Sequence, residues 1–227
     1  MLTAAQLIKY ALQIAKAPLF TTQAEDLLNA RLSTIARRFD IDVLKTFTTI
    51  NLQAGVQKYL LPTDYVRGLA AYYYIGGLPQ TISQIDLNDF NQLNVGNLAM
   101  SYPTMYATDP STAGGQVPYI YFYPMPNVPT PLTLRYASQP PDIASPSTSS
   151  VVPWFPDSMV LLNLLAADLM AITDDTRLGD FSAMASAQFE AFLKMQGDKE
   201  GYAETVKKGN SFRTNRAKLP PSKITGF

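Results

Sequence analysis

Paired acidic residues are the groups in this sequence best suited to acid–base chemistry. Three such pairs lie close together along the chain: Asp40 with Asp42, Asp86 with Asp89, and Asp174 with Asp175. Two carboxylates facing each other across a cleft, about 5 to 9 Å apart, are the arrangement of a glycoside hydrolase. The pairs therefore leave open a hydrolase that uses carboxylates alone, or a carbohydrate-binding domain.

Each pair also has a structural explanation. Asp174-Asp175 lies between two apolar helical segments, where a turn and an N-cap for a helix from Thr176 account for both acids. Asp86 and Asp89 could bind a cation on a short helix, but a hard cation needs about six or more oxygen ligands, which the nearby sequence does not supply. We therefore predict capping and turn roles, with no metal site and no catalytic residue.

The absence of histidine and cysteine excludes further classes of active site. None of the 227 residues is histidine or cysteine, which excludes cysteine and Ser-His-Asp triads, zinc hydrolases and disulfide scaffolds. The double glycines Gly76-Gly77 and Gly114-Gly115 lack the spacing of phosphate-binding loops. We predict that the protein is not an enzyme and binds no cofactor.

Tyrosines gather in the middle of the chain, at Tyr72, Tyr73, Tyr74, Tyr119, Tyr121 and Tyr123. Tyrosines on one face of a strand can stack on nucleobases or sugars, but Arg67 and Arg135 are the only arginines nearby. A protein interface or a half-buried sheet is the favoured interpretation.

Charge is distributed unevenly along a chain that is neutral overall. Residues 199–227 carry seven basic side chains against two acidic ones, a local charge of +5, which leaves −5 for the preceding 198 residues. A basic, Gly- and Pro-punctuated end with few apolar residues is typical of a flexible docking arm or a solvated tail. The candidate docking residues are Lys207, Lys208, Phe212, Arg213, Arg216, Lys218, Lys223 and Phe227.

Hydrophobic periodicity predicts helices at both ends of the body. Capping boxes at Thr3/Gln6 and Thr22/Glu25 start two amphipathic helices separated at Pro18. Trp154-Phe155-Pro156-Asp157 opens a third, broadly apolar helix, and a fourth follows Asp175. An apolar content of 47% is enough for a core, and no apolar run approaches the roughly 20 residues of a membrane span.

Between these helices the hydrophobic periodicity changes from 3.6 residues, typical of a helix, to two residues, typical of a strand. Residues 46–52 and 57–61 are expected to form one β-hairpin, and residues 69–75 and 78–82 a second hairpin around Gly76-Gly77. A short helix is expected at 86–93, with further strands at 104–108, 119–123 and 132–137. Prolines at the strand ends favour a compact antiparallel sandwich or barrel, and residues 139–152 read as an exposed connection back to the helices.

These patterns together predict an α+β protein. A four-helix bundle is built from N- and C-terminal helical hairpins, with an inserted antiparallel β sandwich or barrel and an extended basic C-terminal arm. The expected bounds are 1–45 and 153–200 for the two halves of the bundle, 46–152 for the β domain and 201–227 for the arm.

The run from Gly55 to Arg67 resembles the head-to-tail adaptors of tailed phages, known in short-tailed phages as tail tubular protein A. Its matching positions are Gly55, Tyr59, Leu61, Pro62, Asp64, Tyr65 and Arg67. Later segments are similar in the same order: 103–106, 121–126, 132–136, 154–157 and 174–177. The order over residues 1 to 195 carries the resemblance, because each motif alone is common.

The resemblance implies a structural protein of the virion that sits at the head-to-tail junction and assembles in the host cytoplasm. It implies a homo-oligomeric twelve-fold ring, with the helices toward the portal protein and the β zone toward a tail nozzle or tail tube protein. Duplex DNA passes through transiently, the arm reaches along the portal, and no membrane is involved. A head-completion protein or tail terminator is the alternative within structural proteins.

Overall fold

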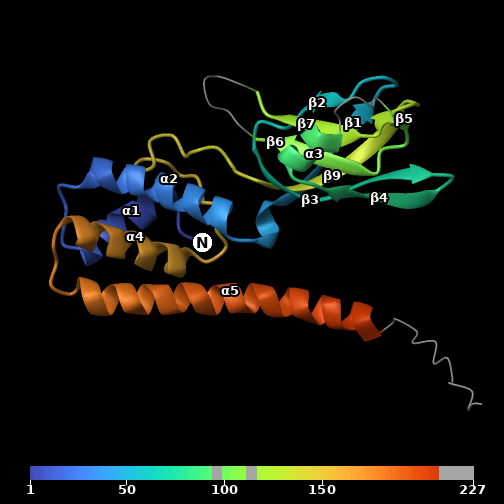
Figure 1. The fold of residues 1–227 in the computed structure, drawn as a ribbon. Helices are drawn as coiled ribbons and strands as arrows, with labels where there is room; N and C mark the ends of the chain where they lie inside the picture. The colour runs from blue at the N-terminus through green and yellow to red at the C-terminus, as the bar shows by residue number, and fades with distance from the viewer. Residues whose placement is uncertain (94–98, 111–116, 210–227) are drawn as a thin grey trace, which may run out of the picture. The chain divides into compact units, whose positions relative to one another are not determined.

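The computed structural model describes residues 1–93, 99–110 and 117–209, with side chains described as far as residue 196. Two helices, a sheet zone and two further helices follow one another along this part of the chain (Figure 1). Residues Met1–Ser186 form one compact unit, and a second unit begins at Ala187. The predicted α+β class is confirmed.

Helix α1 (Ala4–Ile14) begins with the predicted capping box. The Thr3 hydroxyl accepts a hydrogen bond from the N–H of Gln6 at 3.2 Å, and the Gln6 side chain accepts one from the N–H of Thr3 at 3.0 Å. The two bonds satisfy donors that a helix start otherwise leaves unpaired. Ala4, Leu7, Ile8 and Ala11 are buried along the helix.

Helix α2 (Thr21–Arg38) starts one residue before the predicted cap, and the prediction of a capping box at Thr22 and Glu25 is wrong. The helix begins after Phe20 with no side-chain cap, and the Glu25 carboxylate instead accepts a hydrogen bond from the N–H of Ser147 at 3.0 Å. The N–H of Ser147, distant in sequence, therefore takes the place of the N–H at the helix start as the donor to Glu25. A short 3₁₀ helix, η1 (Asp42–Leu44), follows.

Helix α4 (Ser158–Ile172) is capped by Asp157, whose carboxylate accepts from the N–H groups of Met159 and Val160. Nine of its residues are buried on several sides, as expected for a broadly apolar helix, because it packs against both α1 and α2. An ion pair joins α2 to α4, with Arg31 Nε 2.9 Å from Asp168 Oδ2.

Helix α5 (Leu178–Gly209) starts two residues after the expected position and continues beyond residue 200, where the sequence predicts the start of the arm. Only its first part, to Ser186, belongs to the same unit as α1, α2 and α4. Those three helices pack on one another. A four-helix bundle that includes α5 stays a prediction.

The sheet zone holds a seven-stranded sheet in the order β1-β9-β3-β4-β6-β7-β2, while β5 and β8 pair separately. The strands are β1 (Lys45–Leu52), β2 (Lys58–Leu60), β3 (Tyr65–Ile75), β4 (Leu78–Gln84), β5 (Met100–Ser101), β6 (Met105–Asp109), β7 (Tyr119–Tyr123), β8 (Met125–Pro126) and β9 (Thr130–Ser138). The edge strands β1 and β2 line the two sides of one groove, so the sheet is nearly closed.

One predicted hairpin is confirmed and the other is wrong. Strands β3 and β4 pair from Ala71↔Ile82 to Ile75↔Leu78, and Gly76 and Gly77 have φ values of +59° and +81°. This is the positive-φ pair that a primed turn requires. Strands β1 and β2 do not pair with each other, because β1 pairs along its whole length with β9, and β2 pairs with β7.

The sheet is also not wholly antiparallel, which corrects the sequence prediction. Strands β4 and β6 are parallel at Ser83↔Met105 and Gln84↔Tyr106, and the expected short helix, α3 (Leu87–Leu93), lies between them in the sequence. A parallel pair needs a crossover longer than a hairpin turn, and the α3 segment provides it.

The sheet encloses a core of its own. The buried residues that form it are Ile50, Leu52, Leu61, Ala71, Tyr73, Ile82, Tyr106, Ile120, Phe122, Leu132, Leu134 and Tyr136. They come from strands distant in sequence, so the core depends on the sheet topology as a whole.

The connection from β9 to α4 runs back along the helices. Its polar partners on α2 are four residues apart and share one helix face: Glu25, Asn29, Ser33 and Arg37. The Asn29 amide both donates to the carbonyl and accepts from the N–H of Ile143. The segment then meets α1, where the N–H of Ala4 donates to the carbonyl of Val151 at 2.8 Å.

Candidate interaction site

The segment that resembles the adaptor motif begins in the turn after β1. Gly55 has a φ of +77°, and its N–H donates to the carbonyl of Pro126 at 2.8 Å. The Tyr59 hydroxyl accepts from the N–H of Gln53 at 2.7 Å and lies 3.0 Å from the carbonyl oxygen of Val56. Tyr59 therefore fixes the turn that carries the chain away from β1.

The middle of the motif enters the sheet core. Leu61 is 4% exposed, and the carbonyl of Pro62 accepts from the N–H of Tyr65 at 3.1 Å. The Asp64 carboxylate accepts from the Tyr136 hydroxyl at 3.0 Å, and the rings of Tyr65 and Tyr136 have centroids 5.6 Å apart. Burial, helped by Asp64, raises the pKa of Tyr136 to about 12.

The end of the motif caps a helix. The Arg67 guanidinium donates from β3 to the carbonyl oxygens of Phe39 at 3.1 Å and Arg37 at 3.3 Å, at the C-terminus of α2. It also lies 3.2 Å from the Asp40 carboxylate. Cations are favoured at helix C-termini, where carbonyl groups are left unpaired. The motif thus joins the sheet to the helices of the same unit.

The first two acidic pairs make local structural contacts. Lys45 Nζ lies 3.5 Å from the Asp40 carboxylate and 2.9 Å from that of Asp42. The Asp86 carboxylate accepts from the N–H of Asn88 at the start of α3. Among the described side chains, no group of three or more acidic residues is placed to hold a metal ion.

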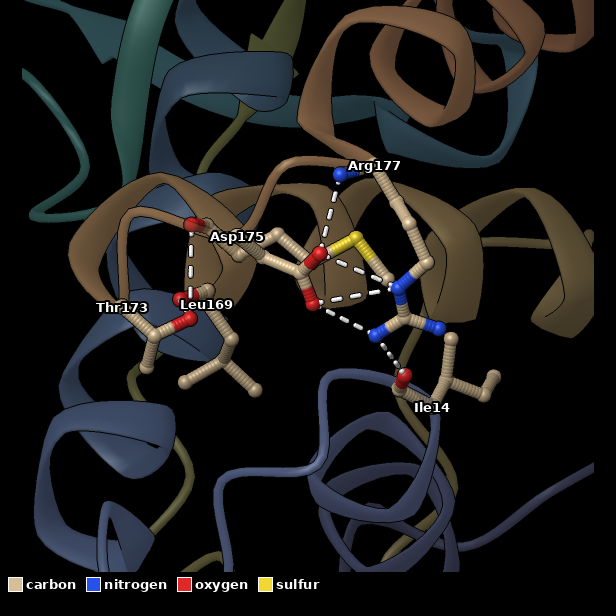
Figure 2. Close-up of polar contacts among 6 residues, drawn as sticks. Ile14, Leu169, Thr173, Asp175 and Arg177 are labelled. Carbon is tan, nitrogen blue, oxygen red and sulfur yellow. Dashed lines mark hydrogen bonds and ion pairs between the residues drawn. The ribbon is translucent and has the colours of Figure 1, made fainter.

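Asp174 and Asp175 lie in the turn between α4 and α5, as predicted, but the predicted N-cap of a helix from Thr176 is wrong, because α5 begins at Leu178. Figure 2 shows Asp175 in this turn. Asp174 has a φ of +50°, and the N–H of Asp175 donates to the carbonyl of Met170, which together form a Schellman-type helix end. The Asp175 carboxylate accepts from the N–H of Arg177 at 2.9 Å and from its guanidinium. These bonds lower the pKa of Asp175 to about 2.

Arg177 also reaches back to α1. Its Nη2 atom donates to the carbonyl oxygen of Ile14 at 3.1 Å (Figure 2). Thr173 closes the same turn, since its hydroxyl donates toward the carbonyl of Leu169 at 3.1 Å. The junction between α4 and α5 is therefore attached to the end of α1, and the acidic pair serves this attachment.

Several tyrosines belong to the sheet core, as the half-buried interpretation predicts. The Tyr73 hydroxyl donates to the carbonyl of Pro103 at 3.0 Å, and burial raises the pKa of Tyr106 to about 12. Tyr74 is different, being 58% exposed near the tip of the β3–β4 hairpin. The Lys58 ammonium lies 3.6 Å from the ring centroid of Tyr119, which is a cation–π contact.

The predicted docking residues lie outside the part of the chain with described side chains. Lys207 and Lys208 fall in the last turn of α5, where only the backbone is described. Phe212, Arg213, Arg216, Lys218, Lys223 and Phe227 lie outside the described residues altogether. No helix in the described ranges is long and apolar enough to cross a membrane.

A groove along α1 is a feature that the sequence patterns did not indicate. It is lined by Ala5, Ile8, Lys9, Leu12, Gln13, Lys16, Pro18, Thr21 and Ser147, and its volume is about 470 Å³. Its residues on α1 recur every three or four positions, so they lie along one side of the helix. Its far wall, Ser147, comes from a segment more than 130 positions later, which no local pattern reveals.

Comparison with known proteins identifies the family. No curated protein matches the chain. A family model described as SU10 adaptor protein matches residues 2–209, which include α1, α2, the sheet, α4 and α5. This match covers most of the 227 residues and agrees with the resemblance to phage head-to-tail adaptors. The chain therefore belongs to the SU10 adaptor protein family and is a structural head-to-tail adaptor of a bacteriophage.

Proposed function

We propose that this adaptor joins the phage portal ring to the tail by assembling into a twelve-fold ring around the path of the DNA. It acts by binding alone, with no cofactor and no reaction to catalyse. The observation that carries the proposal is the family match over residues 2–209. The two tail-side candidates are a nozzle protein and a tail tube protein.

The charge distribution supports a conduit. The first 198 residues sum to −5, so their net charge does not attract the phosphate backbone. A strongly basic ring would hold duplex DNA through counterion release and slow its passage. Strong, salt-sensitive binding of duplex DNA by the purified protein would argue against this part of the proposal.

The basic C-terminal arm is proposed as the portal-docking element. Its excess of basic residues and its low apolar content suit it to bind an acidic surface of the portal protein. The helical part is proposed to face the portal and the sheet to face the tail.

Electron microscopy of the protein mixed with purified portal rings tests the proposal. An added layer with twelve subunits below the portal is expected for the full chain. Deletion of residues 202–227 should leave Met1–Ser186 folded, since these form a compact unit, but should abolish attachment. Attachment to a tail component without attachment to the portal would instead indicate a tail terminator.

A further inference from the structure

The groove on α1 has an apolar floor. Ala5 and Leu12 are half-buried there and keep apolar surface in contact with water, while Ile8 beneath them is only 2% exposed. The wall formed by Ser147 is fixed because the N–H of that residue donates to the Glu25 carboxylate. Contact with this floor would remove apolar surface from water, which is the main source of affinity in such sites.

The end of the groove is fixed by the way α1 terminates. The N–H of Ala17 donates to the carbonyl of Leu12 at 3.0 Å, and Lys16 has a φ of +52°. This is the Schellman arrangement, with Lys16 in the left-handed position. The backbone of Lys16 is therefore held in place before any partner binds.

Two lysines stand on the rim of this apolar floor. Lys9 and Lys16 are both exposed and both line the groove, Lys9 on α1 and Lys16 at the left-handed position just after the helix. Among the described side chains, neither ammonium has a carboxylate within 4.0 Å. Lys16 contributes to the lowered pKa of Asp175, but that carboxylate is already bound by Arg177.

We propose that this groove binds a segment of the portal protein in which an apolar side chain lies between two acidic residues. The apolar group packs on Ala5 and Leu12, and the two carboxylates pair with Lys9 and Lys16. The proposal rests on the portal-binding role given above. The basic arm of this chain carries the same charge as the rim, so it is the wrong occupant.

Photo-cross-linking identifies the occupant directly. The chain has no cysteine, so Gln13→Cys gives one attachment point for a benzophenone maleimide in the full-length protein. Irradiation with portal rings should link it to a portal peptide that has two acidic residues around an apolar one. Ala30→Cys, exposed on α2 and outside the groove, is the control and should not yield that peptide. A link to a second copy, to the arm or to a basic peptide would overturn the proposal.

Charge reversal measures the contribution of the rim. Lys9→Glu with Lys16→Glu should weaken attachment to portal rings at least about tenfold and reduce its dependence on salt. The control, Arg38→Glu with Arg135→Glu, makes the same charge change at exposed residues outside the groove and should bind like the wild type. Lysine substitutions at the two acids of the cross-linked portal peptide should restore binding to the reversed variant.

The outcomes separate the two proposals. If the wild-type protein fails to bind portal rings, the proposed function itself is wrong. If the wild type binds and the double reversal binds equally well while remaining folded, the adaptor role stands and the groove is not the portal contact.

Discussion

Arg177 donates a hydrogen bond to the carbonyl oxygen of Ile14 at 3.1 Å, although 163 positions separate the two residues in sequence. Ile14 is the last residue of α1, whose final carbonyl groups lack partners within the helix. The same guanidinium is held in place by Asp175. One arginine therefore joins the end of the first helix to the turn between the last two.

Replacing Arg177 tests this connection. Arg177→Ala should lower the melting temperature, because the carbonyl of Ile14 and the carboxylate of Asp175 lose their shared donor. Arg177→Lys keeps the charge but not the forked donor, so its melting temperature should lie between those of the wild type and Arg177→Ala. Thermal unfolding followed by circular dichroism measures both. Equal melting of all three proteins would show that the junction does not depend on Arg177.

Acid should weaken the same junction within a defined range of pH. The pKa of Asp175 is about 2 in the folded protein and 3.8 for an ordinary aspartate, so its ionised form stabilises the fold above about pH 4. This contribution falls as the pH drops through that interval and is absent below about 2. Denaturant unfolding at several pH values measures it.

The matched variant for the acid experiment is Asp175→Asn. It keeps an oxygen that can accept from the N–H of Arg177 but has no charge to lose. The difference in stability between wild type and variant should therefore shrink between pH 4 and pH 2. A difference that stays constant over this interval would contradict the lowered pKa of Asp175.

Local features of this fold could be predicted from sequence. The Thr3/Gln6 capping box and the Gly76-Gly77 turn act over three or four residues, so the pattern contains all their partners. The start of α4 after the segment 154–157 was predicted from the same kind of local signal. Each was found at its predicted place because no distant group competes for it.

Features that depend on distant partners could not be predicted. Residues 46–61 have the alternation of a hairpin, yet β1 pairs with β9, about 80 residues later, and not with β2. Glu25 fits a capping box, but Ser147 provides its donor instead. The groove on α1 has the same origin, because Ser147 closes it from another segment. The docking residues from Lys207 to Phe227 stay predictions.

Arg67 offers a test of the adaptor motif. Arg67→Ala should destabilise the protein by about 1–3 kcal/mol, because a charged donor to two carbonyl groups at the end of α2 is lost. Arg67→Lys should lose less stability than Arg67→Ala, since its ammonium group can still reach this helix end. Urea unfolding gives the free energies. Stability unchanged in Arg67→Ala would mean that the motif does not tie the sheet to α2.

A pair of glycines tests the packing of the sheet core. A Cβ atom on Gly68 would lie 2.8 Å from the Tyr106 hydroxyl oxygen, closer than real Cβ contacts, and 3.1 Å from Gln84 Oε1, tighter than most of them. Tyr106 is 2% exposed and its hydroxyl donates to Gln84, so neither group can move away freely. Gly68→Ala should therefore cost about 1–3 kcal/mol in the free energy of unfolding.

Gly179→Ala is the matched control for that substitution. A Cβ atom there meets nothing within 4 Å, and the residue lies in the first turn of α5. Alanine is the better helix former, so this variant should be unchanged or more stable by up to about 1 kcal/mol. Because both changes add one methyl group, the difference between them isolates the contact with Tyr106. Equal stability of the two variants would show that β3 and β6 have room to separate at Gly68.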